Sequence, residues 1–138
     1  GVNQLKSNEL ITVIDDFFYL SRVTLVWEEV PPSISNLSAK VLAVFLLLTS
    51  EALPNGGKII ICINSLGNGL GIACQGIGEA GKLNLEAIKI LTEQSDISEF
   101  TARTIIVKYL QLLLIETGAQ LEVNLDDPDQ LSLAALIP

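Results

Sequence analysis

Apolar residues recur at spacings of three and four positions in several stretches of the chain, which is the period of an α-helix. In the first stretch, the apolar residues are Leu10, Ile14, Phe17 and Phe18, and the pair Asp15-Asp16 lies on the other side. The second stretch is longer and apolar almost all the way round, which is typical of a helix buried on more than one side. The predicted helices are Asn8–Leu20, Asn36–Leu53, Leu83–Thr92 and a long helix that ends at Thr117, just before Gly118.

Between these helices lie short runs of β-branched and other apolar residues, bounded by proline, glycine and asparagine. The Asn68-Gly69 step favours a hairpin between two of these runs. The predicted strands are Thr24–Val30, Lys58–Asn64, Leu70–Gln75, Gln120–Leu125 and Leu131–Ile137. The order predicts one α/β domain over 1–138: a two-layer α/β sandwich with a mostly antiparallel sheet of about five strands and helices on one face.

Residue counts narrow the chemistry. Sixteen acidic against eight basic residues give a net charge of −8, which argues against nucleic acid as a partner. The chain has no histidine, which excludes an imidazole base, a histidine metal ligand and a phosphorylated histidine. Cys62 and Cys74 have no cysteine or histidine neighbours in the sequence, so we expect reduced thiols in the core of a cytoplasmic protein, and no metal.

The hydropathy of the chain argues against a membrane span but predicts apolar surface that a partner covers. The longest apolar run, Val41–Leu48, is far shorter than the roughly 20 residues of a membrane span, so we expect no membrane partner. The mean hydropathy of +0.50 is nevertheless high for a domain on its own, and predicts apolar surface that a partner covers. The chain begins at Gly1 and lacks methionine, so we expect an excised domain or the remnant of a tag rather than a native start.

Two segments carry a family pattern. Val41–Ile59 combines a long apolar helix, a Pro-Asn-Gly-Gly turn and a strand, and is similar to the first half of the Bergerat (GHKL) ATP-binding fold of histidine kinases. Thr104–Val123 resembles the last helix of that fold, the small-residue turn after it and the next strand. More narrowly, Leu48–Gly57, with the strand Thr24–Trp27 before a proline pair, resembles the C-terminal domain of ChpT-type histidine phosphotransferases. The resemblance covers nearly the whole chain.

The resemblance also implies three ATP-binding features that this sequence lacks. The helix that would hold an Mg²⁺-binding asparagine carries Leu48, Thr49 and Ser50 instead. The adenine-binding Asp-x-Gly-x-Gly pattern becomes Cys74–Gly78, without aspartate, and the glycine-rich lid becomes Ser95–Thr101, with two acidic residues and no glycine. We therefore interpret the pocket as vestigial and expect no cofactor. Its remnants would be Ser50, Glu51, Gln75, Gly76 and Gly78.

Partners follow from the same resemblance. ChpT-type proteins are homodimers in which a helical-hairpin domain carries the phosphorylated histidine, and they pass phosphoryl groups to response regulators. Without that helical domain, this chain is expected to be no enzyme by itself, but to help dock response-regulator receiver domains in a two-component phosphorelay. The candidate contact residues are Phe17, Phe18, Lys82, Lys89 and Arg103.

Plainer interpretations of these residues stay open. Glu51 is also explained as a solvated residue in a last helical turn, and the three cations as ordinary surface. The aromatic pair Phe17-Phe18 would face a partner, the helical domain or the sheet of its own domain. Two rival functions remain as well: a divergent GHKL ATPase domain that still binds nucleotide, and a structural interaction domain with no part in a phosphorelay.

Overall fold

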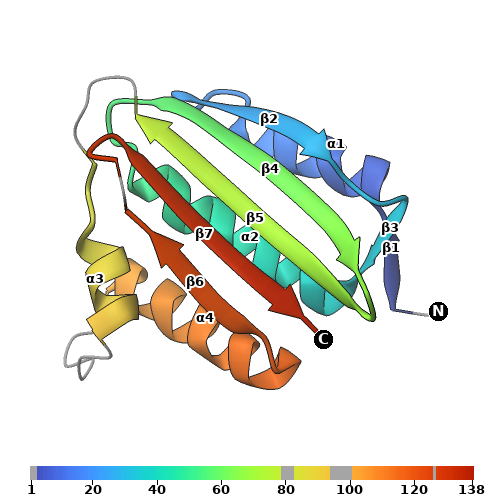
Figure 1. Ribbon diagram of the computed structural model, residues 1–138. Coiled ribbons are helices and arrows are strands. Elements are labelled where there is room, and N and C mark those ends of the chain that lie inside the picture. The colour runs from blue at the N-terminus through green and yellow to red at the C-terminus, as the bar shows by residue number, and fades with distance from the viewer. Residues whose placement is uncertain (1–2, 79–82, 94–100, 126) are drawn as a thin grey trace.

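A computed structural model describes residues 3–78, 83–93, 101–125 and 127–138. In these ranges a five-stranded sheet carries the helices on one face, which confirms the predicted two-layer α/β sandwich (Figure 1). The elements are β1 (Gln4–Lys6), α1 (Ser7–Phe18), β2 (Val23–Glu29), β3 (Ser33–Ser35), α2 (Asn36–Glu51), β4 (Gly57–Leu66), β5 (Gly69–Gly78), α3 (Glu86–Glu93), α4 (Ala102–Thr117), β6 (Gln120–Asn124) and β7 (Gln130–Ile137).

The main sheet has the strand order β2-β4-β5-β7-β6. Three of its neighbouring pairs are antiparallel, as predicted, whereas β2 and β4 are parallel. The parallel pair follows from α2, which connects the two strands as a crossover helix and returns the chain to the same end of the sheet. A second, two-stranded sheet of β1 and β3 was not predicted from the sequence.

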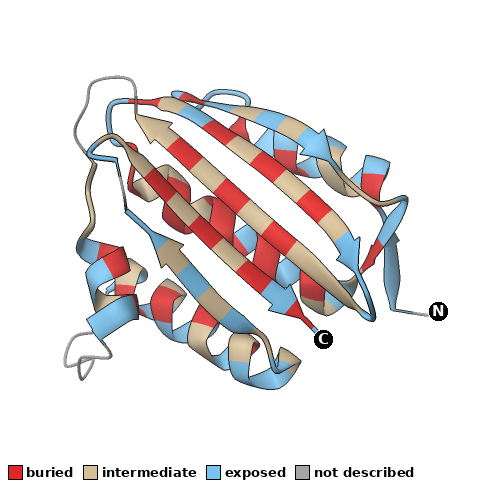
Figure 2. Cartoon of the chain, in the orientation of Figure 1, coloured by how far each residue is buried: buried red, intermediate tan, exposed pale blue. Residues whose placement is uncertain are grey.

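The core lies between the sheet and α2. Along β4 and β5, residues facing the helices are buried and the residues between them are partly exposed, so the colours alternate in Figure 2. Helix α2 contributes Val41, Phe45 and Leu48, all of them fully or almost fully buried. This confirms the prediction of a helix buried on more than one side.

Helix ends follow local hydrogen bonding. Ser35 caps α2 by accepting a hydrogen bond from the Ser38 amide. Helix α4 ends at Thr117, as predicted, and Gly118 follows it in the left-handed conformation. Helix α1 has no side-chain cap, because Lys6 occupies the N-cap position and the Ser7 hydroxyl donates to the Pro31 carbonyl instead. Among the described helices, none combines the length and the apolarity that crossing a bilayer requires.

The two cysteines lie on opposite faces of the sheet. Cys74 pairs in register with Ile61 and is fully buried under the helices, whereas Cys62 pairs with Ala73 and is partly exposed on the open face. Both are free thiols. The expectation of two core thiols is therefore right for Cys74 and wrong for Cys62.

Candidate functional site

The predicted remnants of a nucleotide pocket lie where the end of α2 crosses the second half of β5. Ser50 and Glu51 occupy the last turn of α2, and Gly76 and Gly78 lie near the end of β5. Helices α3 and α4 pack against each other and against α2 beside this crossing. We call the region where α2, the end of β5, α3 and the start of α4 meet the α2–β5 cleft, although side chains fill it.

Side chains from α2 and from the segments next to α2 and α3 fill the floor of the α2–β5 cleft. A Cβ atom placed on Gly76 would lie 2.6 Å from Cγ2 of Thr49 and 3.5 Å from Cδ1 of Leu53. A Cβ atom on Gly78 would lie 3.3 Å from Cδ2 of Leu83 and 3.6 Å from Cδ2 of Leu53. The two glycines thus make room for the protein's own methyl groups, which pack directly on the strand.

The groups around this floor offer little to a polar ligand. Leu48 is buried, and the Thr49 hydroxyl donates to the Phe45 carbonyl oxygen at 2.7 Å, inside its own helix. Burial raises the pKa of the Cys74 thiol far above its ordinary value, so this group stays neutral. Among the described residues, no group of three potential ligands is arranged to hold a metal ion.

Gln75 does not belong to the α2–β5 cleft. Alternate residues of a strand point to opposite faces, so Gln75 lies on the open face, whereas Cys74 and Gly76 face the helices. There the Gln75 Nε2 donates to Gln130 Oε1 on β7 at 3.1 Å. The prediction that Gln75 is a remnant of the pocket is therefore wrong.

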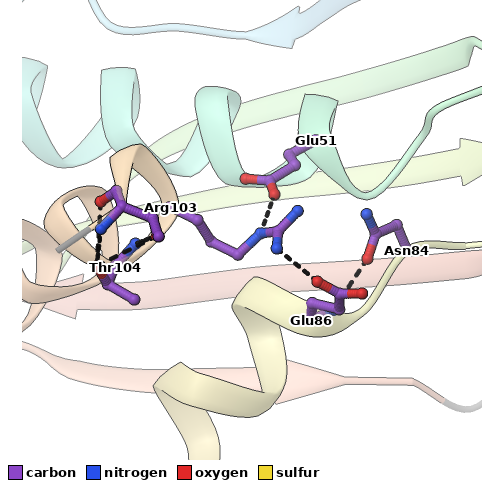
Figure 3. A network of polar contacts seen from close by, with 6 residues as sticks. Glu51, Asn84, Glu86, Arg103 and Thr104 are labelled. Atoms are coloured by element: carbon purple, nitrogen blue, oxygen red, sulfur yellow. Dashed lines mark hydrogen bonds and ion pairs between the residues drawn. The ribbon is translucent and has the colours of Figure 1, made fainter. Parts of the chain in front are cut away.

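An ion-pair network joins α2, α3 and α4 beside this region (Figure 3). The Arg103 guanidinium at the start of α4 donates through Nε to Glu51 on α2 and through Nη1 to Glu86 on α3. The hydrogen bond to Glu51 raises the pKa of Arg103 above its usual value. The side-chain oxygen of Asn84 accepts a hydrogen bond from the backbone N–H of Glu86 in α3, and the backbone N–H of Asn84 donates to the Ala52 carbonyl oxygen.

This network changes the interpretation of two predicted residues. Glu51 is neither an unengaged remnant of a catalytic site nor a freely solvated residue, because it holds Arg103. Arg103 is only partly exposed and is bound by two carboxylates, so it is not a free cation for a partner. Sequence reasoning missed the pairing with Glu86, which has no local signal in the sequence.

The remaining predicted contact residues lie in different environments. Phe17 is 70% exposed, whereas Phe18 is 8% exposed and belongs to the core, so the expectation of a partner contact at Phe18 was wrong. The two rings meet edge to face with centroids 5.1 Å apart. Lys89 is exposed on α3. Lys82 lies outside the described residues, as does the predicted lid segment up to Phe100.

Sequence reasoning also missed the exposed neighbours of Phe17. Val13 and Leu20 are both exposed, and they stand four and three positions from Phe17, on one side of α1 and its C-terminal extension. We call Val13, Phe17 and Leu20 the α1 patch. The spacing was visible in the sequence, but nothing local distinguishes an outward apolar stripe from an inward one.

Comparison with known proteins bears on the family and the fold. The family model of the histidine phosphotransferase C-terminal domain matches residues 7–129. The structure of a bacterial phosphotransferase superposes with a TM-score of 0.84 and 16% identity, over 96% of this chain and 64% of that chain. The mycobacterial sensor histidine kinase MprB gives a TM-score of 0.68 at 12% identity, over 98% of this chain and 95% of that chain. The nucleotide-free catalytic domain of histidine kinase ThkA gives a TM-score of 0.68 at 17% identity, over 98% of this chain and 94% of that chain.

These matches carry different weight. No curated protein sequence matches the chain, and identities of 12–17% to the solved structures establish the fold alone. The chain spans 64% of the length of the phosphotransferase that it matches. The family match, in contrast, covers most of the residues. The chain therefore belongs to the histidine phosphotransferase C-terminal domain family and has the fold of histidine kinase catalytic domains.

Proposed function

We propose that this domain takes part in a bacterial phosphorelay by helping to dock response-regulator receiver domains, and that it does not bind ATP. The phosphoryl chemistry would take place on the histidine of a helical domain, through which the intact cytoplasmic protein forms a homodimer. The observation that carries the proposal is the packing of Thr49 on Gly76, at the cleft floor of a chain from a phosphotransferase family.

Steric and polar terms both disfavour a nucleotide in the α2–β5 cleft. A purine above Gly76 would have to displace the Thr49 methyl group and Leu53, and so break contacts in a closely packed core. Its amino group would then face the neutral thiol of Cys74 instead of a carboxylate. Glu51 and Glu86 at the helical end would repel the phosphates and already neutralise Arg103.

Titration with trinitrophenyl-ATP and Mg²⁺ tests this part of the proposal. We expect no saturable rise in fluorescence below about 1 mM, which corresponds to a binding free energy no stronger than roughly −4 kcal/mol. An Arg103→Ala variant controls for attraction of the probe to the cation at the cleft. Saturable micromolar binding that excess ADP reverses would instead support the rival function, a divergent ATPase domain.

The docking part of the proposal is supported by the α1 patch. Its three apolar side chains are exposed together, and Arg22 follows shortly after Leu20 as an exposed cation. Protein interfaces commonly have an apolar centre, with an aromatic residue that carries much of the binding energy and a polar rim. A receiver domain with an apolar patch and an acidic residue at its edge would fit this surface.

A Phe17→Ser variant is expected to bind receiver domains about tenfold more weakly, because it removes the large aromatic side chain at the centre of the α1 patch. The measurement is calorimetric titration with purified receiver domains encoded in the same genome. Leu66→Ser is the matched control, because Leu66 is also exposed but lies at the β4–β5 hairpin. Equal receiver binding by Phe17→Ser and Leu66→Ser would contradict docking at the α1 patch.

A further inference from the structure

Helix α4 has a second apolar face that the described part of the domain does not cover. Val107, Leu110 and Leu113 are buried against the rest of the domain. The outward side nevertheless carries four large exposed apolar residues, and Ile115 alone is 78% exposed. A helix that is apolar on both sides is usually buried on both sides. We define the α4 face as Ile105, Tyr109, Leu112 and Ile115.

The charges on this side of α4 are few and balanced. Lys108 and Glu116 are both exposed, and they stand four positions before and four positions after Leu112. At 1.5 Å rise per residue, each lies about 6 Å along the helix axis from Leu112, in opposite directions. The α4 face is therefore locally neutral, although the whole domain carries a net charge of −8.

We propose that the α4 face binds the α4 face of a second copy of this chain, with the two helices antiparallel and the two-fold axis next to Leu112. The symmetry places Lys108 of one copy at the level of Glu116 of the other, at both ends of the contact. It also places Tyr109 at the level of Ile115 in the second copy. A parallel pair would bring like charges together, which disfavours that arrangement.

The charges around the α1 patch and the α4 face favour different partners for these two surfaces. Asp16 is exposed beside the α1 patch, three positions after Val13 and four before Leu20, so two copies meeting there would bring carboxylates together. The α4 face, in contrast, complements itself in charge. This inference therefore depends on neither receiver docking nor the absence of ATP binding, and it concerns a contact made by this domain itself.

The interface is expected to be weak. One face of a 16-residue helix is smaller than a standard interface, which buries about 1,600 Å² in total. We therefore expect a dissociation constant in the range of about 10 μM to 1 mM. Such an affinity suits a contact that forms at high local concentration, for instance between domains already held in one assembly.

Sedimentation velocity over a concentration series, with charge-reversal variants of the full chain, tests the proposal. Wild type is expected to shift from monomer to dimer as concentration rises. Lys108→Glu and Glu116→Lys should each weaken the dimer about tenfold, because each creates two like-charge contacts. The double variant, which exchanges the two charges, should recover the wild-type affinity to within about threefold.

Matched controls keep the result specific to the α4 face. Lys40→Glu makes the same charge change at an exposed position of α2 and should leave the dimer unchanged. Circular dichroism establishes that each variant is folded. A monomer at every concentration, failure of the double variant to recover, or an equal loss in Lys40→Glu would overturn the proposal. Receiver binding that Ile115→Ser abolishes in a purely monomeric protein would assign this face to the receiver instead.

Discussion

Replacing Gly76 with alanine should lower the free energy of unfolding by about 2 kcal/mol, although alanine is normally the better residue in a strand. The added methyl group would lie 2.6 Å from Cγ2 of Thr49, which is buried between α2 and the sheet and has little room to move. Urea denaturation of the variant and the wild type, followed by circular dichroism, measures the difference.

The same contact predicts a rescue. Thr49→Ser removes the methyl group that meets Gly76 and retains the hydroxyl that donates to the Phe45 carbonyl. By itself it should cost about 1 kcal/mol, because it deletes a buried methyl group. In the double variant the alanine methyl group takes up the vacated space. The destabilisation of the double variant should therefore be about 1–2 kcal/mol smaller than the sum of the destabilisations of the two single variants.

Gly78→Ala is the matched control for this cycle. Its methyl group would meet the flexible end of Leu83 at 3.3 Å, so its cost should be small, and it should not couple to Thr49→Ser. If the costs of Gly76→Ala and Thr49→Ser simply add, Thr49 does not fill the cleft floor. The steric half of the argument against ATP would then fail, whatever the nucleotide titration shows.

Most of the fold could be predicted because its signals are local. The spacing of Leu10, Ile14 and Phe17 defined a helix, and the glycine after Thr117 marked the end of another. Pairing between distant strands has no such local signal. The parallel pair β2–β4 could still have been inferred, since a strand, a helix and a strand in succession commonly form a parallel unit.

The candidate site was harder to predict for a related reason. Strand alternation alone would have placed Gln75 on the face opposite Cys74 and Gly76, so that error was avoidable. The Arg103–Glu51 pair joins residues 52 positions apart, and no period or motif connects them. Likewise, the sequence showed two adjacent phenylalanines in α1, but only packing decides that Phe18 points inward and Phe17 outward.

The first residue of β4, Gly57, is the most sensitive backbone position that we identify. Gly57→Ala should destabilise the domain by at least about 3 kcal/mol, enough to leave much of a marginally stable domain unfolded. Gly57 has φ of +141°, which side-chain-bearing residues rarely adopt. A Cβ atom there would also overlap the Ile77 carbonyl oxygen on the neighbouring strand β5 and lie 3.0 Å from the carbonyl carbon. The measurement is the thermal midpoint, with the soluble yield as a second readout.

Gly67→Ala separates the strain of a positive φ from the overlap with β5. Gly67 also has a positive φ, of +60°, but a Cβ atom there would meet nothing within 4 Å. It should cost only about 1–2 kcal/mol of backbone strain. A Gly57→Ala variant as stable as Gly67→Ala would mean that β5 moves away from the turn at little cost. In that case the end of β5, and Gly76 with it, would not be held tightly enough against α2 to exclude a ligand by packing. Observation of the expected difference between the two variants would support the rigid cleft floor on which the proposed function depends.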